Sequence, residues 1–172
     1  MDKFGNFISF CNANGVDTSG IEIVCKSESD FGLFAKRDLA EDETVLCIPR
    51  RIILTAEQLP RDPAFRDFAA QDPLVKEMPN LLLVMILIRE LCEKDSFWKP
   101  YVDILPAAYQ TPLYMEYDLL LSLKPSSAFQ ESGKLFRNIA RQYAYFWTQM
   151  NSPQSPASRL SFKGLFTFEL YR

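Results

Sequence analysis

Apolar runs of two kinds divide the chain, and this division limits the possible fold more than any other feature. Before residue 56 the runs are short and rich in β-branched residues, which is typical of strands, and they cover 21–25, 32–35, 43–48 and 51–55. After residue 56 the apolar residues recur at helical spacing over much longer segments. Strands that precede helices, instead of alternating with them, are typical of α+β folds. We therefore predict an α+β fold with its sheet in the first third of the chain.

Two helix boundaries can be predicted from single residues. A first, short helix over 4–11 precedes the strands and is expected to end at Asn14-Gly15, a common helix stop. Asn80 lies just before a long apolar segment, and its side chain can accept a hydrogen bond from a backbone N–H of the first turn. We therefore expect Asn80 to be the N-cap of a helix over 81–93.

The rest of the chain is predicted to be helical, with loops where prolines are dense. Helices are expected over 116–123 and 128–150, the second with any break near Ser132-Gly133, and a last helix begins with Thr167 as its cap. These signals divide the chain into a strand-rich part, 1–56, and an all-helical part, 57–172. Because the last helix has barely begun at Tyr171, we expect the chain to be the truncated front portion of a larger domain.

Composition and charge exclude several classes of function. The chain has 172 residues, a net charge of −3 and no histidine, so neither a basic nucleic-acid surface nor an imidazole catalyst is expected. Its four cysteines form no Cys-x-x-Cys pair, which argues against a zinc site. The longest apolar run, Leu81–Ile88, is far shorter than the roughly 20 residues of a membrane span. Scattered cysteines without a signal peptide favour reduced thiols and a cytoplasmic location, with a nuclear one left open.

Asp30-Phe31-Gly32 matches the magnesium-binding tripeptide of protein kinases, but the surrounding sequence excludes that interpretation. A kinase needs a glycine-rich loop, a strand lysine and a catalytic-loop aspartate before this tripeptide. Only 29 residues precede Asp30, and they contain none of these features. The simplest alternative is a hairpin turn in which Phe31 packs into the core.

Three separated blocks of the sequence resemble SET-domain protein methyltransferases of the Rubisco-methyltransferase-like subfamily. The first block is "GIEIVCKSESDFGLFAKRDLAEDETVLCIP", with its strand, polar turn, "FGL" and apolar strand ending in "IP". The second is "SFWKPYVDILPAAYQTPLYMEYD", over 96–118. The third, "NIARQYAYF" over 138–146 with the later "FTFELYR", is similar to the branch that methylates a histidine of actin. The resemblance implies that 1–56 is the first sheet segment of a SET domain and 57–172 its helical insert, incomplete at the C-terminus.

The resemblance implies a cofactor, S-adenosyl-L-methionine, and the loop that would bind it. Ser29, Asp30 and Phe31 are the expected contact residues, and Gly32 is expected to permit a bend. Backbone N–H and C=O groups can together satisfy the zwitterionic end of this cofactor, and glycine allows a close approach. The subfamily usually has glycine at the position of Asp30, so this chain carries an additional Cβ in the expected loop.

The resemblance also implies where the substrate binds. Asn80, Arg141 and Gln142 match polar residues that line the groove for an extended actin segment. Each has a structural alternative, because Asn80 suits a helix cap and Arg141 can pair with an acid on the helix surface. The neighbouring aromatic residues 143 and 145–147 are expected to be mostly core packing, not a methyl-binding cage.

The expected activity is therefore histidine N-methylation of actin by a monomeric enzyme that binds neither nucleic acid nor membrane. The resemblance places no catalytic residue within these 172 residues, so the chain alone is expected to be inactive. Two alternatives stay open: a lysine N-methyltransferase of the same subfamily, and a non-catalytic binding module.

Overall fold

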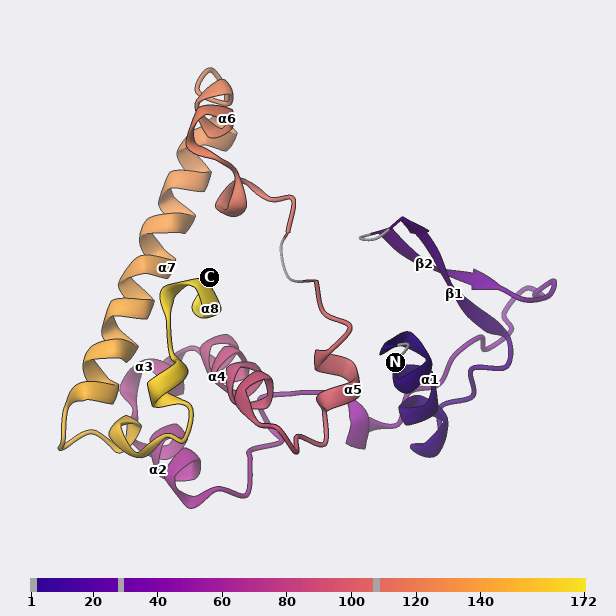
Figure 1. Cartoon of the computed structure of the whole chain (residues 1–172), viewed down its shortest axis with the longest axis horizontal. Coiled ribbons are helices and arrows are strands. Elements are labelled where there is room, and N and C mark those ends of the chain that lie inside the picture. Colours follow the sequence, from indigo (N-terminus) through magenta and orange to yellow (C-terminus); the bar gives the residue numbers. More distant parts are fainter. Residues whose placement is uncertain (1–2, 28–29, 107–108) are drawn as a thin grey trace. The chain divides into compact units, whose positions relative to one another are not determined.

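The computed structural model describes residues 3–27, 30–106 and 109–172. The chain divides into two compact units, the first made of Met1–Thr55 with Asp95–Pro106 and the second of Ala56–Lys94 with Ala107–Arg172. The sequence predicted a single boundary at residue 56, which would assign 95–106 to the helical part. The structure instead groups this segment with the N-terminal unit. In the structure this segment contains a short helix, α5 (Lys99–Val102), that contacts the first helix of the chain (Figure 1).

The first unit begins with a helix and continues into a β-hairpin. Helix α1 (Lys3–Ala13) ends where predicted, and Gly15 follows it with a φ of 82°, a conformation that glycine adopts without strain. Strands β1 (Ile21–Ser27) and β2 (Asp30–Ala35) pair antiparallel, with Ile21 opposite Ala35. Two of the four predicted strands are therefore present, and β2 begins two residues earlier than expected.

The predicted strands over 43–48 and 51–55 are wrong. In the part of the chain that the structure describes, the sheet contains β1 and β2 alone. Residues 43–49 form no regular element, and the next segment contains a short 3-10 helix, η1 (Arg50–Ile52). A strand is defined by a hydrogen-bonded neighbour, and no described segment pairs with this one. Its apolar side chains stay exposed, as Ile48 does to 48%.

The core of the first unit lies beneath α1. Cys11, Val16 and Ile52 are buried together, and the rings of Phe7, Phe10 and Trp98 pack around them. Segment 95–106 supplies Trp98 to this cluster, which explains why the structure groups it with the N-terminal residues although it lies more than 40 residues further along the chain.

The second unit is helical, and three of its helices begin with proline. These are α2 (Pro63–Gln71), α3 (Pro73–Glu77) and α4 (Pro79–Cys92). Proline suits the first helical position, where an N–H has no partner within the helix. Asp62 and Asp72 cap α2 and α3 by accepting hydrogen bonds from Ala64 N at 3.0 Å and Val75 N at 2.9 Å.

Asn80 is not the N-cap of α4, so that prediction is wrong. Pro79 takes the first helical position, which moves the cap to Met78 and places Asn80 in the first turn. The cap of α4 has no side-chain hydrogen bond. Proline's fixed φ of about −65° is already helical, so the helix begins one residue before the amide that was expected to cap it.

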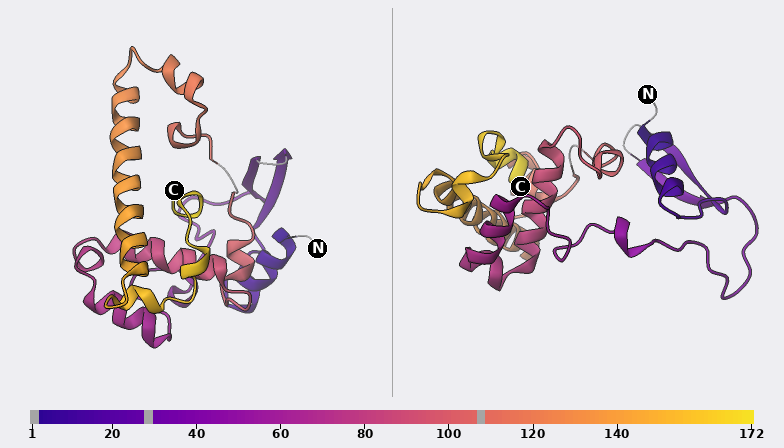
Figure 2. Two further views of the ribbon diagram at one scale, coloured as in Figure 1. Left: turned by 60° about the vertical axis from the view of Figure 1, so that its left-hand side comes forward. Right: turned by 90° about the horizontal axis from the view of Figure 1, so that it is seen from below.

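One long helix organises the second unit. Helix α7 (Ser127–Asn151) runs without a break through Gly133, and α6 (Tyr117–Ser122) lies near its N-terminal end, while α2, α3 and α4 lie beside its C-terminal half (Figures 1 and 2). The last helix, α8 (Phe168–Tyr171), is capped as predicted by Thr167, whose side chain accepts from Leu170 N at 3.2 Å.

Aromatic rings fill the core between these helices. Phe68 of α2 and Phe146 of α7 are fully buried, and their ring centroids lie 6.1 Å apart in an edge-on arrangement. Phe65 packs edge-on against Phe68 at 5.9 Å. A small antiparallel sheet followed by a helical unit confirms the predicted α+β class.

Candidate functional site

The expected cofactor loop lies at the closed end of the β-hairpin. Ser29 falls outside the described residues, whereas Asp30 and Phe31 form the start of β2, opposite Ser27 and Cys25. The register shifts between Cys25 and Ser27, which leaves Lys26 outside the one-to-one pairing. Such a bulge releases backbone donors and acceptors from the ladder. This end of the hairpin therefore provides the kind of main-chain groups that a zwitterionic ligand requires.

Phe31 is tied to the first helix. Its ring is half-buried and lies 4.1 Å, centroid to centroid, from the ring of Phe4 in α1. This contact fixes the start of β2 against α1 and uses one face of the ring that was expected to cover the cofactor.

Gly32 has a different local role from the predicted one. It lies within β2, opposite Val24, and does not have the positive φ of a glycine bend. An added Cβ would come within 2.9 Å of the Phe34 ring, closer than van der Waals contact allows. The glycine leaves room for that ring.

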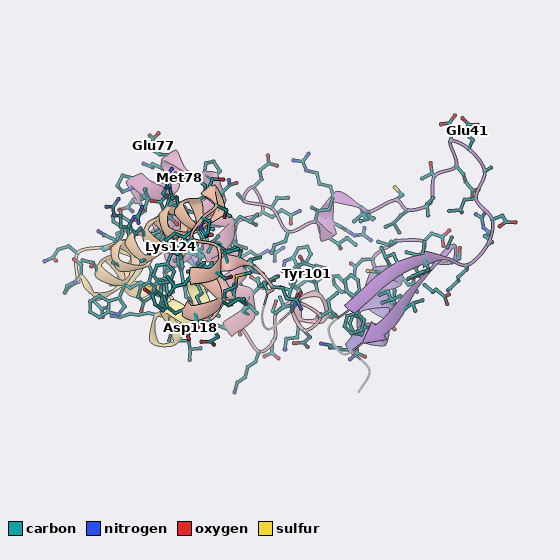
Figure 3. The ribbon with its side chains drawn as sticks, turned by 90° about the horizontal axis from the view of Figure 1, so that it is seen from above. Glu41, Glu77, Met78, Tyr101, Asp118 and Lys124 are labelled. Carbon is teal, nitrogen blue, oxygen red and sulfur yellow. The ribbon has the colours of Figure 1, made fainter. Side chains whose placement is uncertain are left out.

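An apolar cavity of about 360 Å³ lies within the first unit, beside the hairpin. Ile21, Ile23 and Leu33 of the hairpin contribute to its wall, together with residues of α1, the segment 46–54 and Trp98. Tyr101 of α5, which is labelled in Figure 3, also lines it. No charged side chain lines this cavity. It therefore suits an apolar group, not the charged end of S-adenosylmethionine.

Two of the three predicted substrate residues lie next to each other in α7, and the third lies in α4. Arg141 and Gln142 are consecutive residues of α7, and Arg141 is exposed without an ion pair in the described chain. Within the described residues, Arg141 therefore does not form the surface ion pair that was its structural alternative. Asn80 is exposed in the first turn of α4, and no hydrogen bond joins it to either residue within the described ranges.

Two hydroxyl groups hold this part of α7, and sequence reasoning missed both contacts. The Tyr171 hydroxyl donates to Gln142 Oε1 at 3.3 Å, and the Tyr145 hydroxyl donates to Asp72 Oδ2 at 3.0 Å. The other carboxylate oxygen of Asp72, which is only 5% exposed, caps α3. The Asp72-Pro73 pair is a sequence signal for the cap, but no local pattern predicts a partner 73 residues away.

Both tyrosine hydroxyls have a pKa above that of free tyrosine. Burial, together with the hydrogen bond to Asp72, raises the pKa of Tyr145 to about 12. Burial raises the pKa of Tyr171 to about 12 as well. Both hydroxyls therefore keep their protons, and remain hydrogen-bond donors, at any physiological pH.

The aromatic residues around this turn are packed against the rest of the unit, as expected. Phe146 is fully buried, and the Tyr143 ring stacks on Phe166 at 5.2 Å. Trp147 differs from them because it is 51% exposed. The described residues contain no group of three or more possible metal ligands. No helix among them is long and apolar enough to cross a membrane.

Comparison with solved structures defines the fold. The SET domain of LSMT bound to lysine and AdoHcy superimposes with a TM-score of 0.77 at 20% identity, over 98% of this chain and 36% of that one. Rubisco LSMT bound to AdoMet gives 0.77 at 19% identity, over 99% and 38%. The chain therefore has the fold of part of a SET domain.

Sequence comparison gives more specific relatives. Actin-histidine N-methyltransferase of Gallus gallus is 35% identical over 171 residues, which cover 99% of this chain and 28% of that protein. The Homo sapiens protein of the same name is 34% identical over the same number of residues. The chain thus spans less than a third of the length of these relatives. No family model matches it. These comparisons confirm the resemblance predicted from the sequence.

Proposed function

We propose that this chain is part of an S-adenosylmethionine-dependent SET-domain methyltransferase that modifies a histidine of actin. The observation that carries the proposal is the 34–35% identity to actin-histidine N-methyltransferases over 99% of the chain. The SET fold supports the reaction class, because its solved neighbours were crystallised with AdoHcy or AdoMet.

The cofactor would be held at the closed end of the hairpin. We assign its amino-acid end to the backbone of Ser29, Asp30, Phe31 and Gly32, which adjoins the bulge at Lys26. Bound S-adenosylmethionine would supply an electrophilic methyl group for an imidazole nitrogen of the substrate. The protein needs to align the two partners and exclude water. The absence of histidine from the chain is compatible with this role, because the nucleophilic imidazole belongs to the substrate.

The substrate segment would contact Asn80, Arg141 and Gln142. All three are polar and at least partly accessible, and Arg141 has its guanidinium available because no acid in the described chain pairs with it. We further propose a monomeric, actin-binding protein of the cytoplasm, with a nuclear location as a second possibility, and we assign no nucleic-acid partner.

A chimera tests the proposal. This chain would replace the matching 171 residues of the Gallus gallus relative, so that the remaining 72% of that protein is present. Transfer of labelled methyl to an actin peptide with one histidine is the expected result. The control peptide carries alanine in place of that histidine and should stay unlabelled. Loss of transfer in a chimera that melts cooperatively would overturn the proposal.

Lysine methylation is the second candidate, favoured by the solved neighbours that were crystallised with lysine or methyllysine. These neighbours are only 18–20% identical to this chain, against 34–35% for the histidine-specific relatives. A third peptide with lysine at the target position separates the two. Faster transfer to lysine than to histidine would favour this candidate. Peptide binding without transfer to either peptide would favour a binding module.

A further inference from the structure

The side chain of Gln142 is fixed by a buried tyrosine from the far end of the chain. Tyr171 is 8% exposed, and its ring packs among Tyr143, Phe146 and Phe166 at centroid distances of 5.6 to 6.2 Å. Its hydroxyl donates to Gln142 Oε1 at 3.3 Å. Tyr171 thus uses its ring for packing and its hydroxyl for a single contact with the amide.

Tyr171 is itself held in place from both sides. Thr167 caps the short helix in which it lies. The next residue, Arg172, places its guanidinium 4.8 Å from the centre of the Tyr114 ring and forms an ion pair with Glu169. The hydroxyl of Tyr171 therefore occupies a defined position beneath α7.

The contact decides which end of the Gln142 amide is free. An amide has an oxygen that only accepts and an NH₂ group that only donates. The Tyr171 hydroxyl occupies one of the two lone pairs of the oxygen, and in the described chain Nε2 has no protein partner. The adjacent Arg141 guanidinium carries only donors as well. These two side chains therefore present mainly donors to a ligand, because the amide oxygen of Gln142 is directed at the Tyr171 hydroxyl.

We propose that Tyr171 is a positioning residue that makes the 141–142 turn recognise hydrogen-bond acceptors of the substrate. The ligand chemistry that fits is an extended peptide that presents backbone carbonyls or a carboxylate. The inference rests on the proposed function, in which Arg141 and Gln142 contact the actin segment.

The backbone of α7 is held independently of this contact. Tyr145 lies one turn after Arg141 and is anchored through its hydroxyl to the buried Asp72. Removing the Tyr171 hydroxyl should therefore release the Gln142 amide without displacing the helix. This separation makes the positioning role testable apart from stability.

The direct test is nuclear magnetic resonance of the Gln142 side-chain amide in the 172-residue chain. Gln142→Leu identifies the signal by removing it. Tyr171→Phe removes only a hydroxyl and should shift this signal. Tyr143→Phe is the matched control, because in the described chain that hydroxyl has no hydrogen bond, and it should leave the signal in place. An unchanged signal in Tyr171→Phe would overturn the positioning role whatever the function is.

The functional test uses the chimera defined above. Tyr171→Phe should raise the KM for the actin peptide about fivefold, the effect of one neutral hydrogen bond, with kcat and cofactor affinity unchanged. Gln142→Glu keeps an acceptor for Tyr171 but removes the NH₂ donors, so it should raise KM at least as much as Gln142→Leu. In the Gln142→Leu background, Tyr171→Phe should have no further effect.

The outcomes separate this inference from the proposed function. If Gln142→Leu does not change the KM, the proposed substrate contact is wrong and the inference with it. If Gln142→Leu raises the KM and Tyr171→Phe does not, the proposed function stands and the positioning role is overturned. A lower KM in Gln142→Glu would show that the substrate presents donors, which also contradicts the inference.

Discussion

Single residues determine the backbone conformation at the closed end of the hairpin and in the turn that follows β2. At its closed end, Phe31 and the bulge beside Lys26 set the position of the main-chain groups assigned to the cofactor. In the turn that follows the hairpin, Asp42 has a φ of 61°, in the left-handed region that side chains other than glycine rarely adopt. The Arg37–Glu43 ion pair spans this turn.

Phe31→Pro should weaken S-adenosylmethionine binding at least tenfold in the chimera, because proline removes a backbone N–H and fixes φ. Isothermal titration calorimetry measures the affinity directly. Phe31→Leu keeps the N–H and is the control for the side chain. Equal affinities of the proline variant and the wild type would move the cofactor site away from this strand.

Two substitutions at Asp42 should have opposite effects on stability. Asp42→Gly relieves a left-handed conformation and should stabilise the chain by up to about 1 kcal/mol, whereas Asp42→Val should destabilise it by about 1–2 kcal/mol. Urea unfolding monitored by circular dichroism gives both values. A destabilising glycine would mean that the aspartate side chain makes a contact worth more than the backbone strain.

At the scale of elements, α7 depends on contacts with residues far away in the sequence. Asp72 ends α2 through its backbone N–H, and its carboxylate caps α3 and accepts from Tyr145 of α7, so one residue joins three helices. Tyr171 joins α8 to α7 in the same way through Gln142. The orientation of the candidate substrate surface therefore follows from the packing of the whole second unit.

Tyr145→Phe should lower the free energy of unfolding by about 1–2 kcal/mol, because it leaves a buried carboxylate oxygen of Asp72 without its donor. Tyr143→Phe, in the same helix, should change it by much less. The two variants are compared by urea unfolding. Equal losses would show that the Asp72 contact contributes nothing specific.

The two hydrogen-bonded tyrosines also predict a dependence of stability on alkaline pH. Their folded pKa values of about 12 lie above the ordinary value of 10.0, so folding favours the protonated form. Their contribution is complete below about pH 10 and is lost as the pH rises through 12. Absorbance at 295 nm should show Tyr145 and Tyr171 titrating at a pH well above 10. In Tyr145→Phe and in Tyr171→Phe, one late titration should disappear.

At the scale of the whole molecule, the first unit exposes large apolar side chains beside its apolar cavity. Leu33 is 63% exposed and Ile48 48%, and both border the apolar cavity. Exposed apolar patches beside open strand edges favour association.

The 172-residue chain should therefore bind the dye ANS at this cavity. Because it matches only 28% of the length of the Gallus gallus relative, we also expect that it transfers no methyl group on its own. Leu33→Ser combined with Ile48→Ser should reduce the dye fluorescence, whereas serine at the exposed Leu119 of α6 should not. Equal reductions would place the dye elsewhere. Turnover by the purified chain would overturn the assignment of all catalytic residues to parts of the relatives outside this match.

The sequence by itself determined the α+β class, the end of α1, the hairpin strands, the cap of α8 and the resemblance that proved to extend over the whole chain. Each depends on local spacing or on a residue whose conformational preference acts within a few positions. The tertiary structure decided that 43–48 forms no strand among the described residues, because pairing needs a neighbour that local sequence cannot specify. It also decided that Gln142 meets Tyr171 and that Asp72 meets Tyr145, since these groups are 29 and 73 residues apart and only the packing of the helices brings them together.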